Sequence, residues 1–132
     1  MKTQLLILAA LALIIVGGTI AWFVLPAQKA DAPATPAEIT AEADAVIVRT
    51  PTGYEPKEIT IKKGDIVEFK NESGEFHWPA SDLHPTHGVY PEFDPLRPIA
   101  DGESWKFQFD KVGVWKYHDH IRANKVGTIT VE

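Results

Sequence analysis

Apolar and polar residues alternate along much of the chain after residue 44, with the two-residue period of a β-strand. In the clearest run, residues 103–109, the aromatic side chains of Trp105, Phe107 and Phe109 fall on one face. Alternating or β-rich runs lie at residues 45–49, 58–62, 66–70, 103–109, 114–120 and 127–132. Turns that contain Gly and Asp separate them, and no helical period is present. The pattern predicts an all-β fold for residues 44–132, an antiparallel sandwich or barrel.

The first 43 residues break this pattern. Residues 5–25 carry no charge and would span about 30 Å as a helix, the thickness of bilayer hydrocarbon. We expect residues 1–25 to be a retained N-terminal transmembrane helix, because the run is longer than the apolar part of a signal peptide; a cleaved signal peptide is the alternative. Residues 26–43 are rich in Ala and Pro and predict a linker. Lys2 before the run and acidic residues after it favour a single-pass protein of the cell membrane with an extracytoplasmic C-terminal domain.

The charge of the domain excludes some functions. Residues 44–132 contain 11 Lys/Arg and 15 Asp/Glu, which argues against nucleic acid and against an anionic lipid surface as partners. No Ser or Cys stands near a His in a motif with known catalytic mechanics, and the sequence has no Gly-rich phosphate loop. Hydrolytic and nucleophilic catalysis therefore find no support.

All five histidines lie in two short segments. His77, His84 and His87 fall within residues 77–87, and His118 and His120 fall within residues 117–120. Imidazole is the commonest side-chain metal ligand, and this clustering predicts a metal site. The chain has no Cys, and its one Met is the first residue, so a metal here would have nitrogen and oxygen ligands. That donor set favours Cu²⁺, with zinc as the rival. The alternative is an exposed histidine-rich loop and strand without a metal.

Strand alternation sets the geometry that we expect for this site. His118 and His120 point away from the aromatic face of residues 114–120, with their Cβ atoms about 6–7 Å apart. Pro85 stiffens the loop that bears His84 and His87. If that loop folds over the strand, three or four imidazole nitrogens meet. Asp82 and Asp94 resemble turn residues, and Asp94 is also a candidate to orient a histidine.

Several segments together resemble the cupredoxin family. They are residues 53–67 (GYEPKEITIKKGDIV), Asn71 with His77, residues 113–117 (GVWKY) and residues 127–131 (GTITV). The resemblance covers residues 44–132 and implies a cupredoxin-like antiparallel Greek-key β-sandwich. Cupredoxins bind blue copper through one His after the third strand and a Cys-x-x-His-x-x-Met segment. His77 matches the first His, but Asp119, Arg122 and Lys125 stand where the other three ligands would be. The resemblance therefore implies a non-blue variant.

Two further motifs resemble those of multicopper oxidases. Residues 84–87 (HPTH) are similar to their His-Pro-x-His segment, and residues 118–120 (HDH) are similar to their His-Cys-His segment with the Cys replaced. For Asp119 we expect an ion pair with Arg122, which would fill the emptied blue-copper position, and direct metal ligation is the alternative. His77 either joins the histidine cluster or makes hydrogen bonds within the core near Asp119.

These observations predict a copper-binding protein. We expect the ligands to be His84, His87, His118 and His120, with His77 as a further candidate. The expected role is copper handling or electron transfer with a redox partner protein. A copper-dependent redox enzyme acting on oxygen or a small reductant is one alternative. A metal-free structural or adhesive module that kept the fold is the other.

Overall fold

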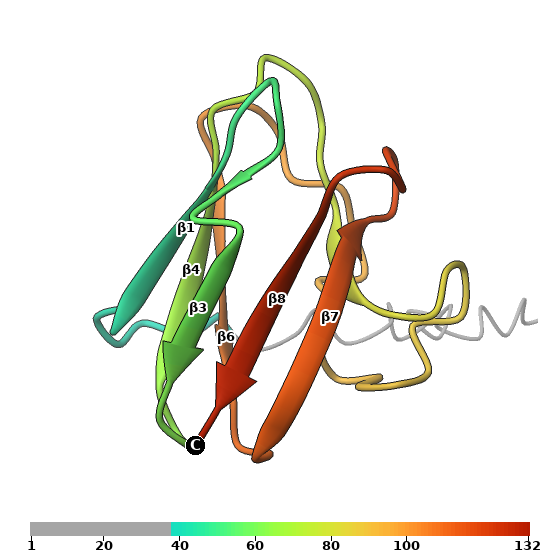
Figure 1. Cartoon of the computed structure of the whole chain (residues 1–132). Coiled ribbons are helices and arrows are strands. Elements are labelled where there is room, and N and C mark those ends of the chain that lie inside the picture. The colour runs from blue at the N-terminus through green and yellow to red at the C-terminus, as the bar shows by residue number, and fades with distance from the viewer. Residues whose placement is uncertain (1–37) are drawn as a thin grey trace, which may run out of the picture. The chain divides into compact units, whose positions relative to one another are not determined.

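The computed structural model describes residues 38–132, which form strands and no helix. The strands are β1 (Ala45–Arg49), β2 (Tyr54–Glu55), β3 (Glu58–Ile61), β4 (Ile66–Asn71), β5 (Pro79–Ser81), β6 (Ser104–Gln108), β7 (Gly113–Asp119) and β8 (Val126–Val131). They make two four-stranded sheets, in the orders β2-β1-β4-β6 and β3-β8-β7-β5 (Figure 1). The predicted all-β sandwich is confirmed, and each of the six predicted strand runs contains a strand.

The sheets are mixed, so the expectation of a wholly antiparallel sandwich was wrong. β1 pairs parallel with β4, and β3 pairs parallel with β8, while the other four pairings are antiparallel. The reason is the path of the chain. After β2 the chain leaves the first sheet, and β3 pairs with β8 in the second sheet. The chain then returns to the first sheet, where β4 runs beside β1 in the same direction. A parallel pair needs such a crossover, since a tight hairpin can only join antiparallel strands.

Aromatic side chains fill the space between the sheets. Phe69 of β4 and Tyr117 of β7 meet edge to face, with ring centroids 5.6 Å apart. Phe93, from the long connection between β5 and β6, contacts both rings. All three side chains are fully buried. Phe93 thus attaches the long connection to the core, and this contact helps to fix the position of the polar residues in the connection.

No helix within residues 38–132 is long and apolar enough to cross a membrane. The apolar run at residues 5–25 and most of the predicted linker lie outside the described residues. The transmembrane helix and the domain boundaries therefore remain predictions.

Candidate metal centre

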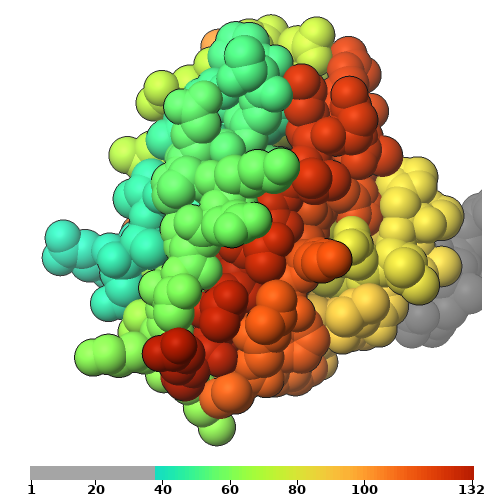
Figure 2. All heavy atoms as spheres, in the orientation of Figure 1, coloured from blue at the N-terminus to red at the C-terminus, as the bar shows by residue number. Residues whose placement is uncertain are grey.

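The long connection between β5 and β6 lies against the side of β7, as Figures 1 and 2 show for the yellow segment beside the orange strand. Ser81, at the end of β5, fixes its course. The Ser81 Oγ lies 2.8 Å from the carbonyl oxygen of His87 and 3.0 Å from that of Tyr90, and it accepts a hydrogen bond from the Tyr90 backbone N–H. Ser81 is fully buried, and its one hydroxyl proton is shared between these carbonyls while its oxygen accepts from the Tyr90 N–H.

This loop brings His84 to the two histidines at the end of β7. One ring nitrogen from each of His84, His118 and His120 lies within 4.8 Å of the others. The ring centroid of His84 is 5.1 Å from that of His118 and 4.9 Å from that of His120. His84 is exposed, His120 is half-buried and His118 is buried. We call these three residues the histidine cluster. Three neutral imidazoles around one point are a donor set for a divalent transition metal.

Asp82 fixes the orientation of His118. The Nδ1 atom of His118 lies 3.1 Å from Oδ1 of Asp82, and its Nε2 atom is buried without a hydrogen-bond partner. Burial lowers the pKa of His118, although the Asp82 carboxylate acts in the opposite direction. With Nδ1 donating to the carboxylate, the lone pair of Nε2 is left free. A carboxylate behind a histidine is the usual support for a metal-binding imidazole.

His87 lies beside the cluster. Its Nε2 atom is 2.9 Å from Nδ1 of His120, and its Nδ1 atom is 2.5 Å from Oδ2 of Asp94. The expectation that Asp94 orients a histidine is confirmed. The φ angle of His87 is +52°, an uncommon value for a residue other than Gly, and its backbone N–H donates to the carbonyl of Leu83. The loop thus holds the His87 ring in one place.

Trp78 packs beside His120 and also donates a hydrogen bond to Asp94. Its ring centroid is 4.9 Å from that of His120, and its indole Nε1–H donates to Oδ1 of Asp94 over 2.7 Å. The pKa of His120 is lowered by partial burial and by the neighbouring histidines. Both effects keep the imidazole neutral, which is the form that binds a metal.

His77 lies outside the histidine cluster. Its side chain is fully buried in the core region, its ring centroid is 6.1 Å from that of Tyr54, and neither ring nitrogen has a hydrogen-bond partner. Burial lowers its pKa to about 4, so it is a neutral imidazole at ordinary pH. The structure therefore gives His77 neither the other imidazoles nor the core hydrogen bond that the sequence suggested.

Asp119 forms an ion pair, but with a different partner from the one expected. Its Oδ2 atom lies 3.2 Å from Nε of Arg49, and both side chains are buried. Its Oδ1 atom accepts hydrogen bonds from the backbone N–H groups of Trp78 and Ile121. Arg122 pairs instead with Glu75 in an exposed salt bridge of 3.1 Å. The expectation of an Asp119–Arg122 pair was wrong, because Arg49 reaches the carboxylate from inside the sandwich.

The interior position does not fit blue copper. The aligned cysteine position holds a carboxylate that is already satisfied by Arg49 and two backbone amides. Lys125, at the aligned methionine position, directs its ammonium group to the carbonyl of Thr52 over 2.8 Å. Only His77 of the four aligned ligands offers a free nitrogen. A copper–thiolate centre needs the sulfur that this chain lacks.

Arg49 was not identified from the sequence as the partner of Asp119 at the interior position. It ends the alternating run of residues 45–49, in phase with the buried Ile47. A charged residue at an inward-facing position of a strand is costly unless it is paired. That phase was the available signal for a buried partner of Asp119. The loop carboxylate Asp82 carried no comparable signal, because Asp is common in turns.

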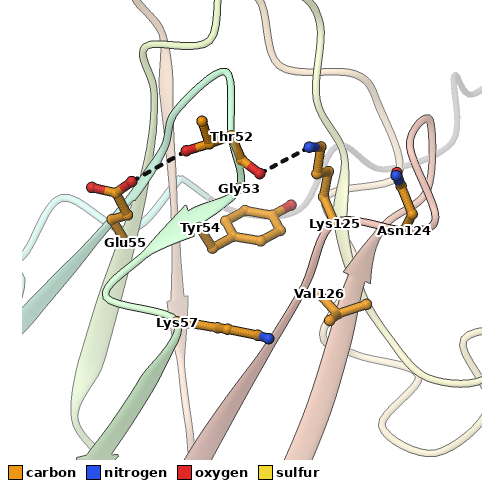
Figure 3. Close-up of a pocket in the computed structure, with 8 residues that line it drawn as sticks. All are labelled: Thr52, Gly53, Tyr54, Glu55, Lys57, Asn124, Lys125 and Val126. Carbon is orange, nitrogen blue, oxygen red and sulfur yellow. Dashed lines mark hydrogen bonds between the residues drawn. The ribbon is translucent and has the colours of Figure 1, made fainter.

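A shallow pocket of about 230 Å³ lies on the outer side of Tyr54 (Figure 3). Lys57 and Lys125 flank it, but Lys125 is bonded to Thr52, and Glu55 accepts a hydrogen bond from the Thr52 hydroxyl. The Tyr54 hydroxyl is buried, so a molecule in the pocket would not reach it. The pocket contains none of the five histidines.

The comparison with solved structures supports the fold. No family model and no curated protein matches the sequence. Among solved structures, a purple cupredoxin from Nitrosopumilus maritimus is similar, with 24% identity and a TM-score of 0.59 over 67% of this chain and 100% of that one. A reduced Cu(I) form of an amicyanin mutant at pH 4 has 23% identity and a TM-score of 0.60 over 76% and 92% of the two chains. An oxidised form of another amicyanin mutant has 24% identity and a TM-score of 0.58 over 73% and 88%. The domain thus has a cupredoxin-like fold.

Proposed function

We propose that this chain is a copper-binding protein whose ion is held by the histidine cluster and not at the interior position of blue copper. One observation carries the proposal. The Nε2 atom of His118 is buried without a partner, while Asp82 holds the other ring nitrogen and His84 and His120 converge on the same place. A buried nitrogen without a partner is costly, and a metal bond would satisfy it. The alternative, an exposed histidine-rich loop and strand without a metal, leaves this nitrogen unsatisfied.

Copper is favoured over zinc by the general order of affinities for nitrogen ligands. The similar structures named above include a Cu(I) form of amicyanin, which supports the same choice. Copper supplies one-electron chemistry through the Cu(II)/Cu(I) couple. Zinc remains the rival ion, because three imidazoles are also a zinc donor set. We infer a role in copper handling or in electron transfer with a redox partner protein.

The metal content of the protein tests this proposal. The full chain, purified without chelators and without a histidine tag, should contain one copper per chain, or bind one when Cu(II) is added. His118→Ala combined with His120→Ala should lose binding by at least a thousandfold, since two of three ligands are gone. His77→Phe is the matched control, a buried histidine outside the cluster, and should bind as the wild type does. Copper binding that survives the double substitution would refute the site.

We also propose that residues 1–25 anchor the chain in the cell membrane and that the domain lies outside the cytoplasm. The support is the sequence alone: an uncharged run of 21 residues, Lys2 before it and acidic residues after it. Mass spectrometry of the native protein should find the whole N-terminus in the membrane fraction. A mature chain that begins between residues 26 and 31 would show instead that the run is a cleaved signal peptide.

A further inference from the structure

The hydrogen bonds around His87 determine where its proton lies. The Oδ1 atom of Asp94 accepts from two N–H donors, the indole of Trp78 and the backbone of Leu96, each at 2.7 Å. Its Oδ2 atom faces Nδ1 of His87 at 2.5 Å. An ionised carboxylate can only accept, so Nδ1 of His87 must carry the proton of that hydrogen bond. In neutral His87, Nε2 then has a lone pair and no proton.

That lone pair points to His120. The Nε2 atom of His87 is 2.9 Å from Nδ1 of His120, which is an ordinary hydrogen-bond length. Because His87 Nε2 can only accept, Nδ1 of His120 is the donor. His120 is thereby fixed in the tautomer that keeps its proton on Nδ1 and leaves Nε2 free. The grouping of ring nitrogens within 4.8 Å contains His84, His118 and His120, and it does not contain His87.

We propose that His87 is a positioning residue and not a fourth ligand, so that the ion has three imidazole ligands and an open position for a small exogenous ligand. The inference rests on the proposed function. Asp82 supports His118, and Asp94 supports His120 through His87. Asp82 thus lies directly behind a ligand, and Asp94 lies behind the supporting His87, so neither carboxylate is assigned to the ion. The sequence, by contrast, predicted His87 as a ligand with His84, His118 and His120, and left open whether three or four imidazole nitrogens meet.

The class of exogenous ligand follows from charge and exposure. Three neutral imidazoles leave the full positive charge of the ion, which attracts water, hydroxide or a small anion. The cluster is exposed at His84, whereas His87 and His118 are 6% and 2% exposed. The open position is therefore on the side of His84, where a molecule as small as azide can approach from solvent.

Pulsed paramagnetic resonance of the Cu(II)-loaded full chain tests this proposal by counting imidazole ligands. We expect three, and we expect azide to change the spectrum. His87→Gln should leave the count at three and the copper affinity within about tenfold, because the Gln carbonyl can accept the His120 hydrogen bond in place of Nε2. His87→Ala should weaken binding by about 10- to 100-fold, as loss of an outer support does. His84→Gln is the matched control and should reduce the count to two.

The outcomes separate this inference from the proposed function. Four imidazoles in the wild type and three in His87→Gln, with no response to azide, would overturn the positioning role and leave copper binding standing. A wild-type protein that binds no copper would overturn both. The wild-type count does not depend on the folding of any variant, so the inference is tested even if His87→Ala does not fold.

Discussion

Two regions of this domain place a buried histidine near a carboxylate, and the carboxylates have different partners. In the interior, Asp119 pairs with Arg49 and accepts from backbone amides, while His77 has no hydrogen-bond partner. In the histidine cluster, Asp82 faces His118. Asp94 likewise faces His87 on the cluster's flank.

The difference shows that buried carboxylates serve two purposes within one fold. A carboxylate behind an imidazole fixes its tautomer and aims its free lone pair. A carboxylate paired with a buried guanidinium instead compensates that buried charge. The interior position is thus occupied by an ion pair, whereas the histidine cluster has imidazole nitrogens that could hold a metal.

The largest effect should come from breaking the interior ion pair. Arg49→Met leaves the Asp119 carboxylate buried without its cation, and should destabilise the metal-free protein by about 3–5 kcal/mol in denaturant unfolding. Copper affinity should stay within about tenfold, because the cluster does not use Arg49. Arg122→Met is the control. It breaks the exposed pair with Glu75, which should cost about 0–1 kcal/mol. Equal costs for the two variants would contradict the interior role of Arg49.

The next effect concerns acid. The pKa of His77 is about 4 in the folded protein because the ring is buried, and about 6.5 in the unfolded chain. Between these values the unfolded chain binds a proton that the folded chain does not. Stability is therefore lost as the pH falls from about 6.5 toward 4, by up to about 3 kcal/mol.

His77→Phe should remove most of this acid sensitivity and keep copper binding unchanged. The pH dependence of the free energy of unfolding is measured by denaturant unfolding of the metal-free protein at neutral pH and at about pH 4.5. The smaller slope that remains should come from His118 and His120, whose pKa values are also lowered. An unchanged slope in His77→Phe would mean that the interior histidine is not the acid-sensitive group.

A smaller effect is expected from the loop that carries His84. Ser81→Ala removes the hydroxyl that bonds the His87 and Tyr90 backbones, and leaves buried groups unsatisfied at a cost of roughly 1–3 kcal/mol. Copper affinity should fall as well, because the loop positions the cluster. Thr86→Ala is the control in the same loop, since its hydroxyl is exposed. Loss of stability without any loss of copper affinity would show that these loop hydrogen bonds do not position the histidine cluster.

The smallest effect should come from Lys125→Met, which restores a methionine at the position aligned with the blue-copper ligand. Lys125 points outward to Thr52, so the change should alter stability by no more than about 0.5 kcal/mol. The absorption spectrum and copper affinity should not change. A new intense visible band would show that the interior position still takes copper.

The sequence predicted the sandwich better than its pairing. Runs such as residues 66–70 and 103–109 have enough alternating residues to define a face, and both formed strands. The sequence did not predict two short strands, Tyr54–Glu55 and Pro79–Ser81, because two or three residues are too few to show an alternation period. The parallel partners of β1 and β3 depend on contacts between distant segments, which local alternation does not encode.

The sequence indicated which residues make up the candidate site, but not the hydrogen bonds and ion pairs among them. Clustering of the histidines indicated the region where the structure brings three of them together, and strand phase put His118 on the outer face, where the loop covers it. The pairing of Asp119 depended on Arg49, which is 70 positions away in the chain. The place of His87 behind His120 depends on hydrogen-bond directions, which residue spacing does not determine.

Anomalous diffraction at the copper edge, from crystals of the full chain grown with Cu(II), would locate the ion. We expect one peak between His84, His118 and His120, and no peak beside His77. A peak at His77 and Asp119, with the histidine cluster empty, would contradict this expectation.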